Sequence, residues 1–306
     1  LAAKLNIDPL TFRKINAVSE GDLMPNNLPY NSIGLNEVLA EIESHPHWNS
    51  PITGPNQGRG LAVGFWIGGT GISSSVILLH ADGSVTVSTC QVDLAGTRTT
   101  MAQMVADLLQ IPIENVNVRV VNTSSAPWTD GTWGSRSTWT QSIALQDASE
   151  DIISQMKRQV ASHLDSQVDK IEYQDQIFYI KDSPDQSMTW KEVAGESIRS
   201  PGGPICASGS VTKVQEAPAF AALLVDVEVD LDTGKIKLLR CTCFQDVGCA
   251  INPQQVEGQL QGGTTQGIGW ALHEYYHYDY HRIVLRLDVC SFFGLLRGFE
   301  LCHFVD

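Results

Sequence analysis

The feature that most restricts the fold of this chain is an amphipathic run near its middle. Ile152, Met156 and Val160 recur every four residues, a spacing that places apolar side chains on one face of an α-helix. The pattern predicts one long helix that begins near Ser137 and runs to about His163.

Strand-like runs lie on both sides of this helix and come in hairpin pairs. In residues 73–94, two β-rich runs are joined by Asp82-Gly83, a dipeptide typical of hairpin turns. Residues 171–180 and 220–244 have the same pattern. Further helices are predicted within residues 1–17 and at 97–109, 190–194 and 253–276. Because strands and helices alternate irregularly and without a repeat, the predicted fold class is α+β.

Charge and cysteine content exclude several classes of protein. Lys and Arg number 20 against 34 Asp and Glu, and the net charge of −14 repels nucleic-acid phosphates. No apolar run is long enough to span a membrane and the first residues resemble no export signal, so we expect a cytoplasmic protein. The seven cysteines form no C-x-x-C pair, which predicts a reducing compartment and no iron–sulfur cluster held by this chain.

Two segments place a glycine, an arginine and several hydroxyl groups at the start of a helix. One lies in VDLAGTRTTMAQ and the other in GTWGSRSTWTQ. A helix N-terminus exposes backbone N–H groups and the positive end of the dipole, so these segments suit a phosphate-bearing cofactor. The alternative is that both are ordinary caps with exposed arginines. The candidate residues are Gly96, Thr97, Arg98, Thr99, Gly134, Ser135, Arg136 and Ser137.

A third segment, QDVGCAINPQQVEGQLQGGTTQGIGWALHE, combines a helix start at Asn252-Pro253 with many glycines inside the predicted helix. Each glycine costs a helix about 1 kcal/mol relative to alanine, so the glycines indicate close approach of a ligand or of another backbone. Gln259, Gln261 and Gln266 carry amides that donate and accept at once, as recognition of a heterocycle requires. Tight helix packing is the alternative explanation.

Taken in their order along the chain, these segments resemble the molybdopterin-binding large subunit of the xanthine dehydrogenase and aldehyde oxidase family. The likeness rests on LNIDPLTFRKINAVSEGD, DGSVTV, GTRTTMAQMVADLLQIP, GTWGSRST, VDVEVDLDTG and the glycine-rich third segment. It implies a molybdenum atom held by a pterin dithiolene, which hydroxylates an aldehyde or an N-heterocycle with oxygen from water. The protein's part in such a site is binding, orientation and electrostatics.

The resemblance also assigns positions around the cofactor. Gly134, Ser135 and Ser137 fall where the family's loop contacts it, and Gln266 falls on a glutamine that reaches the molybdenum. The nucleotide form of the cofactor, such as a cytosine dinucleotide, is left open.

At one position the sequence departs from the family. Gly96 matches the glycine that ends the family's G-Q-G loop, but Ala95 stands where the glutamine would be. A hydrogen bond to the pterin is therefore not expected from residue 95. Arg98 is the candidate to contact the pyrophosphate in its place.

The resemblance divides the chain into three parts. Residues 1–52 would be the end of a first molybdenum-cofactor-binding domain with its linker, residues 53–280 the second such domain, and residues 281–306 an atypical tail. The linker is predicted in residues 46–60, which are rich in Pro, Gly and Asn. We name no catalytic residue, because the family's late G-x-G-E motif, whose glutamate is the general base, has no counterpart here. We expect a truncated subunit that works with iron–sulfur and flavin subunits, or with missing domains, in a hetero-oligomer.

Two other functions compete with this interpretation. His273, Glu274 and His277 fit H-E-x-x-H, the pattern of zinc metalloproteases, although the chain turns strand-like directly afterwards. A zinc hydrolase would use these three residues. The other alternative is a non-catalytic remnant that at most assembles with a partner.

Overall fold

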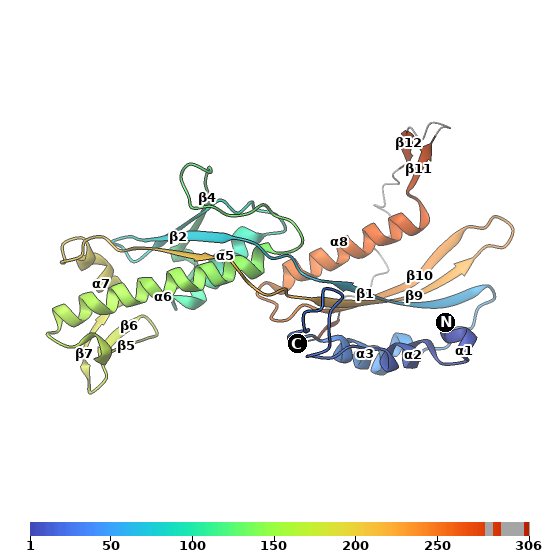
Figure 1. Ribbon diagram of the computed structural model, residues 1–306, viewed down its shortest axis with the longest axis horizontal. Helices are drawn as coiled ribbons and strands as arrows, with labels where there is room; N and C mark the ends of the chain where they lie inside the picture. The colour runs from blue at the N-terminus through green and yellow to red at the C-terminus, as the bar shows by residue number, and fades with distance from the viewer. Residues whose placement is uncertain (279–283, 289–302, 306) are drawn as a thin grey trace. The chain divides into compact units, whose positions relative to one another are not determined.

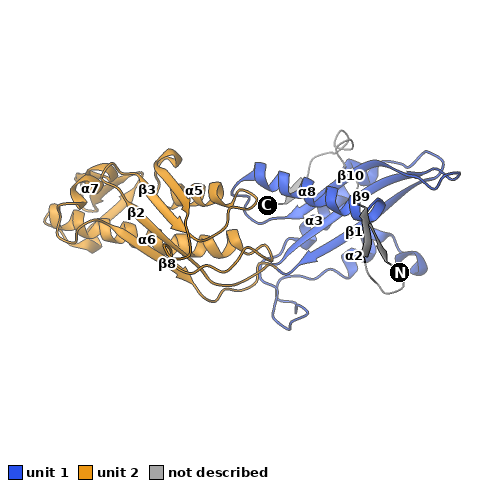
Figure 2. Ribbon diagram, turned by 90° about the horizontal axis from the view of Figure 1, so that it is seen from above, with its two compact units in different colours: residues 1–67, 218–306 blue, residues 68–217 orange. Residues whose placement is uncertain are grey.

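The computed structural model describes residues 1–278, 284–288 and 303–305. Packing divides the chain into two compact units, which Figure 2 colours separately. Unit 1 contains residues 1–67 and 218–306, and unit 2 contains residues 68–217. Both units combine helices with small sheets, which confirms the α+β fold class. These units are defined by packing alone. The predicted boundary between two cofactor-binding domains after residue 52 stays a prediction.

Unit 1 is built on a four-stranded sheet in the order β1-β9-β10-β13. β1 (Gln57–Trp66), β9 (Ala219–Val229) and β10 (Ile236–Asp246) are antiparallel, and β13 (His303–Val305) pairs in parallel with β10. The predicted β9–β10 hairpin is therefore confirmed.

Helices lie on both faces of this sheet, with α2 and α3 on one side and α8 on the other (Figure 1). The apolar face of α3 packs with Phe220, Leu224 and Phe244 of the strands. The core of unit 1 therefore lies between α3 and one face of the sheet. The helices of unit 1 are α1 (Ala2–Leu5), α2 (Pro9–Ile15), α3 (Leu35–Ser44), α4 (Pro46–Asn49) and α8 (Pro253–Leu272).

Residues 46–60 are not a linker but part of unit 1. Pro46 begins α4, β1 starts at Gln57, and the His47 side chain is fully buried. Proline and glycine misled the prediction because proline fits the first position of a helix, and because glycine can stand in an edge strand at a cost in stability.

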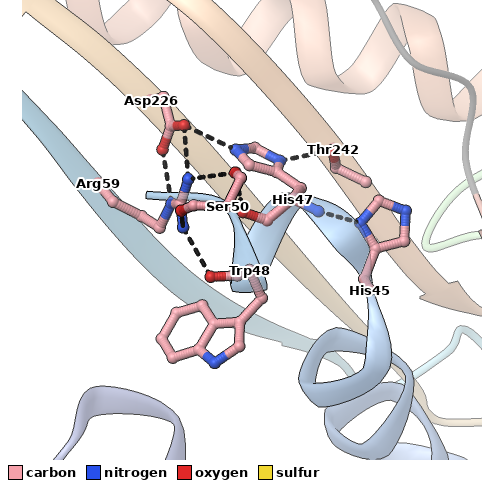
Figure 3. Close-up of polar contacts among 7 residues, drawn as sticks. All are labelled: His45, His47, Trp48, Ser50, Arg59, Asp226 and Thr242. Carbon is pink, nitrogen blue, oxygen red and sulfur yellow. Dashed lines mark hydrogen bonds and ion pairs between the residues drawn. The ribbon is translucent and has the colours of Figure 1, made fainter. Parts of the chain in front are cut away.

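A polar cluster fastens this segment to the sheet (Figure 3). Arg59 donates from Nε and Nη2 to the two carboxylate oxygens of Asp226, at 2.7 and 2.8 Å, and from Nη1 to the Trp48 carbonyl at 2.7 Å. His47 lies between two partners, with Nε2 3.2 Å from Oδ2 of Asp226 and Nδ1 2.7 Å from Oγ1 of Thr242. We call these residues the Arg59 cluster.

Unit 2 contains a second four-stranded sheet, in the order β4-β3-β2-β8. β3 and β4 are parallel, whereas β2 is antiparallel to both β3 and β8. The turn at Asp82-Gly83 joins β2 to β3 as predicted. The strands are β2 (Ser73–Leu79), β3 (Val85–Thr89), β4 (Val116–Val120) and β8 (Cys206–Val211).

The long helix α6 (Ser137–His163) has the predicted bounds and packs along β2 and β8 (Figure 1). Its contact with β8 is close, because a Cβ atom on Gly209 would collide with the backbone of Ala144. α5 (Thr97–Leu108) packs against α6 and β4. The remaining elements of unit 2 are the 3₁₀ helices Ile113–Asn115 and Val168–Lys170, the sheet of β5 (Ile171–Gln174), β6 (Ile177–Ile180) and β7 (Ser183–Thr189), and α7 (Trp190–Ser197).

Beyond α8, strands β11 (Tyr275–Tyr278) and β12 (Val284–Asp288) form an antiparallel hairpin. The predicted helix was four residues too long at this end, since α8 stops at Leu272. Within the described residues, no helix is long and apolar enough to cross a lipid bilayer.

Candidate functional site

Four loops of unit 2 meet at one edge of its four-stranded sheet. β3 and β4 are parallel, so the loops that follow them, residues 90–96 and 121–136, leave from the same edge. Because β2 runs antiparallel to its neighbours, residues 68–72 before it and residues 212–217 after β8 reach this edge too. In sheets with parallel strands, ligands commonly bind beyond the carboxyl ends of those strands. Both segments predicted to bind an anion therefore come to one place.

Glycines allow two of these loops to touch backbone to backbone. The N–H of Gly69 donates to the carbonyl of Gly134 at 2.5 Å, and a Cβ atom on Gly69 would lie only 2.8 Å from that oxygen. Gly134 and Ser135 have φ values of 60° and 63°, so the loop is held in a left-handed conformation that a serine rarely adopts. The Gly68–Gly71 loop thus supports the loop before α6.

Arg136 supports the same loop from inside the protein. Its side chain is completely buried, and it donates to the carbonyls of Asp130 at 2.8 Å and Ile72 at 2.5 Å and to the hydroxyl of Ser73 at 2.7 Å. The guanidinium group was predicted to face a phosphate. Its position instead makes Arg136 a positioning residue that joins residues 72–73 to residues 130–136.

Asp130 is a second residue of this support, and sequence analysis missed it. One carboxylate oxygen accepts from the backbone N–H of Ile72 at 2.8 Å and the other from Nε1 of Trp128 at 2.9 Å. The hydrogen bond from Trp128, then that from Ile72, and the charge of Arg136 hold the pKa of Asp130 below its usual value. Only a long-range contact reveals this role, since Ile72 is 58 residues away.

The other predicted segment lies at the start of α5. Gly96 is the N-cap with φ 75°, and the Thr97 side chain is buried with its hydroxyl donating to the Leu94 carbonyl at 2.5 Å. Arg98 and Thr99 are exposed at the first turn.

An acidic side chain of the protein already occupies the N-terminus of α5. The backbone N–H of Arg98 donates to Oδ1 of Asp93 at 3.1 Å, and the Arg98 Nε atom is 3.8 Å from Oδ2. Asp93 therefore takes the place of an anion within the chain. Sequence analysis missed it, although an acid shortly before a helix is a common capping signal.

The two segments are tied together by Gln91. Its Nε2 atom donates to the Thr132 hydroxyl at 2.5 Å, and its backbone N–H donates to the hydroxyl of Thr89 at 3.0 Å. Thr89 also accepts from Nε2 of the buried Gln141 at 3.2 Å. The loop after β3 and the loop before α6 thus share one buried polar layer, which was not predicted.

Several polar atoms of this layer have no hydrogen-bond partner. Of seven such buried side-chain atoms in the described residues, four lie here: Gln91 Oε1, Arg136 Nε, Ser137 Oγ and Gln141 Oε1. An unpartnered buried polar group costs about 1–3 kcal/mol, and native proteins contain few of them. Their concentration at one edge fits a site that a polar ligand or ordered water completes. Amide, hydroxyl and guanidinium groups together can meet the mixed donors and acceptors of a pterin.

Gln266 lies in unit 1, on α8, and is exposed. Positions for Cβ atoms on Gly262, Gly263 and Gly267 beside it have no described atom within 4 Å. Packing within the described chain is therefore not the reason for these glycines. Only Thr264 and Gly269 of this helix are buried.

The HEYYH segment does not form the helical motif of a zinc protease. α8 ends at Leu272, His273 follows it, and β11 starts at Tyr275, so the two histidines do not share one helical face. The residues that the structure describes contain no cluster of three metal-binding side chains either. The zinc-hydrolase alternative has no structural support.

Comparisons with known proteins identify the family of this chain. The family model for the molybdopterin cofactor-binding domain matches residues 38–286. A putative xanthine dehydrogenase molybdenum-binding subunit of Escherichia coli is 28% identical, over 89% of this chain and 39% of the relative. The carbon monoxide dehydrogenase large chain of Afipia carboxidovorans is 32% identical, over 72% of this chain and 28% of the relative.

Solved structures share the fold. Carbon monoxide dehydrogenase from Oligotropha carboxidovorans superposes with a TM-score of 0.87 at 24% identity, over 99% of this chain and 42% of that one. Quinoline 2-oxidoreductase from Pseudomonas putida gives 0.86 at 20% identity, over 100% and 43% of the two chains. The relatives are named as oxidoreductases, which supports neither the zinc hydrolase nor the remnant. The chain belongs to the molybdopterin cofactor-binding family of the xanthine dehydrogenase and aldehyde oxidase type, and it spans 39% of the Escherichia coli relative.

Proposed function

We propose that the loop edge of unit 2 forms one wall of the molybdopterin site of a molybdenum hydroxylase. The observation that carries this proposal is the group of four unpartnered buried polar atoms at the edge that holds both predicted loops. A folded protein tolerates such atoms where a ligand supplies the missing partners.

The loop before α6 contributes in two ways. Ser137 would donate its buried hydroxyl to the cofactor, since that hydroxyl has no partner in the described chain. Gly134 and Ser135 would present main-chain groups, and Arg136 would hold them in place through residues 72 and 130. The left-handed backbone conformation at residues 134 and 135 is strained at the serine, and this strain is the energetic cost of the arrangement.

The start of α5 would receive the pyrophosphate. Arg98 would contact it with its exposed guanidinium, while Gly96, Thr97 and Thr99 shape the first turn. A bound pyrophosphate would compete with the Asp93 carboxylate for the backbone N–H of Arg98. Asp93 must therefore give up this hydrogen bond or share it. By resemblance to the family, Gln266 on α8 is also a proposed cofactor-binding residue.

The activity of the complete protein follows as a proposal from the same site. Bound molybdenum supplies the chemistry, which is hydroxylation of an aldehyde or N-heterocycle with oxygen from water. Support comes from relatives named nicotine 6-hydroxylase large subunit, from Paenarthrobacter nicotinovorans, and aldehyde oxidase, from Homo sapiens. We also propose a cytosine dinucleotide form of the cofactor, iron–sulfur and flavin partner subunits, and a cytoplasmic hetero-oligomer.

Metal and pterin analysis tests the cofactor proposal. The protein is purified from a host that synthesises the cofactor, and molybdenum, zinc and the fluorescence of oxidised pterin are measured per chain. Molybdenum together with pterin is the expected result. Stoichiometric zinc without pterin, or a folded protein with neither, would overturn it.

A separate assay tests the activity. The assembled, molybdenum-loaded complex is given aldehydes and N-heterocycles with an artificial electron acceptor in water labelled with oxygen-18. Labelled product is expected, and unlabelled product or no turnover would contradict the proposed reaction.

A further inference from the structure

Unit 2 contains a cavity at the far end of α6 from the Ser137 loop. Its volume is about 560 Å³, and it lies between the last turns of α6 and residues 200–202. With a rise of about 1.5 Å per residue, the lining residues Gln155 to His163 lie roughly 27 to 39 Å along α6 from Ser137. The polar residues that line the cavity are Gln155, Arg158, Gln159, Ser162, His163 and Ser200.

Hydrogen bonds between the helix and the facing chain segment shape this cavity. Gln155 donates from Nε2 to the carbonyl of Cys206 at 2.7 Å, and one turn later Gln159 donates to the carbonyl of Gly203 at 3.3 Å. Ser200 donates its hydroxyl to the carbonyl of Glu196 at 2.9 Å. The walls are therefore fixed by contacts that a ligand does not need to supply.

Two of the residues that line the cavity offer acceptor atoms. Gln159 Oε1 is buried and has no hydrogen-bond partner in the described chain. The opposite amide orientation would place this oxygen against the Gly203 carbonyl, so the contact of Nε2 fixes which atom is free. Ser200 has already used its proton and can only accept. Both side chains therefore suit a ligand with hydroxyl or amine donors.

The other side of the cavity offers positive charge and donors. Arg158 donates from Nη1 to Ser154 at 2.9 Å, while its contact with Asp151 is long, 4.0 Å, and its side chain is 55% exposed. His163 adds a ring nitrogen, and the lining residues include no carboxylate. In a chain with a net charge of −14, a cavity lined in this way favours an anion.

We propose that this cavity binds a small hydroxylated oxyanion. The anionic group, a carboxylate or a phosphate, faces Arg158 and His163, and the hydroxyl groups donate to Gln159 and Ser200. A hydroxy acid and a sugar phosphate share this chemistry. The site is independent of the molybdopterin proposal, because none of its residues belongs to the loop edge.

Titration calorimetry on the full chain tests the proposal with four probes: glycerol 3-phosphate, glycerate, inorganic phosphate and glycerol. The two hydroxylated anions are expected to bind at least about tenfold more tightly than phosphate or glycerol, because only they engage both sides of the cavity. The stronger of the two identifies the anionic group. Equal binding of inorganic phosphate, or no binding of any probe, would overturn the proposal.

Two arginine variants serve as a matched pair. Arg158→Gln is expected to weaken binding of the stronger probe by about tenfold or more, the loss of roughly one charge-assisted hydrogen bond. Arg119→Gln removes an equal charge from the exposed residue on β4 and should leave binding unchanged. Equal losses in both variants would indicate a general charge effect and contradict the assigned site. Circular dichroism confirms that each variant is folded, and no cofactor is needed.

Discussion

Two arginines, Arg136 fully buried and Arg59 largely buried, show how differently the two units use charge. Arg59 in unit 1 is 12% exposed and forms a two-point ion pair with Asp226. Arg136 in unit 2 is completely buried and donates to carbonyls such as that of Ile72, with no ion pair among the described residues. The Nε atom of Arg136 has no partner, whereas Arg59 Nε donates to Asp226.

The two clusters have different consequences for function. The Arg59 cluster joins residues 47–59 to β9 and β10, and its charges are paired, so its role is structural. The buried polar layer around Arg136 leaves donors and acceptors unused where the loops of unit 2 meet, so its polarity is available to a ligand. Burial of a charge is therefore no sign of a binding site, but a local excess of unpartnered polar atoms is.

The largest effect is expected from Arg136→Leu. Removing the guanidinium leaves the carbonyls of Asp130 and Ile72 and the Ser73 hydroxyl without their donor. The free energy of unfolding of unit 2 should fall by about 3–5 kcal/mol in urea denaturation. Arg119→Leu, on the surface of the same sheet, should change it by less than about 0.5 kcal/mol. Similar values for the two variants would refute a supporting role for Arg136.

The Arg59 cluster should respond next to Asp226→Asn. The change leaves Arg59 and His47 without their carboxylate, but the Asp226 side chain is 16% exposed, so solvent reduces the cost. We expect a loss of about 2–4 kcal/mol. Hydrogen exchange of the β1 amides should accelerate, and Asp185→Asn on the exposed β7 provides the control. Unchanged exchange in β1 would mean that the cluster does not fasten residues 47–59.

Gly69→Ala probes the backbone contact between loops. The added Cβ atom would lie 2.8 Å from the Gly134 carbonyl oxygen and 3.0 Å from that of Trp133, and neither backbone atom can move freely. A loss of about 1–3 kcal/mol is expected in thermal or urea unfolding. Gly131→Ala, in the facing loop, is the matched variant, because its Cβ atom would meet only Trp133 at 3.6 Å. If both variants unfold with the same free energy as the parent, the contact at Gly69 is not tightly packed.

The smallest effect is the pH dependence of unit 1. Burial lowers the pKa of His47 from 6.5, and Arg240 and Arg59 add to this against the opposing charge of Asp226. As the pH falls below 6.5, the unfolded chain takes up the proton first, so stability present above 6.5 is lost as the pH falls through the folded pKa. Unfolding measured between about pH 7.5 and pH 5.5 should show a decline of at most about 1 kcal/mol.

His47→Gln should abolish most of this decline, and His80→Gln, at an exposed position, should keep it. Protonation of Asp226 affects the stability of unit 1 only at lower pH. Burial alone would raise its pKa, but the hydrogen bond from Arg59 and the nearby charges outweigh burial and lower it from 3.8. Its stabilising contribution is therefore lost only as the pH falls below 3.8.

Local sequence patterns predicted the helices and strands. The side-chain contacts between residues far apart in the sequence could not be predicted from such patterns. Four-residue apolar spacing predicted α6, and the helix predicted at 190–194 corresponds to α7, which begins with a capping box of Thr189 and Glu192. Arg59 and Asp226 are 167 residues apart, so no local pattern could pair them. The same limit explains why Arg136 was expected to face a ligand: the helix start was visible in the sequence, but the carbonyls that claim its guanidinium were not.

The most direct test of the account is the pterin content of a serine variant. Ser137→Ala removes an unpartnered buried hydroxyl at the loop edge, and Ser149→Ala removes another, about 18 Å further along α6. Each protein is purified from a host that makes the cofactor, and oxidised pterin is measured per folded chain. We predict that Ser137→Ala retains clearly less pterin than the parent while its stability without cofactor is unchanged or higher, and that Ser149→Ala retains as much as the parent. Full pterin content in Ser137→Ala, or an equal loss in both variants, would contradict the placement of the cofactor at this edge.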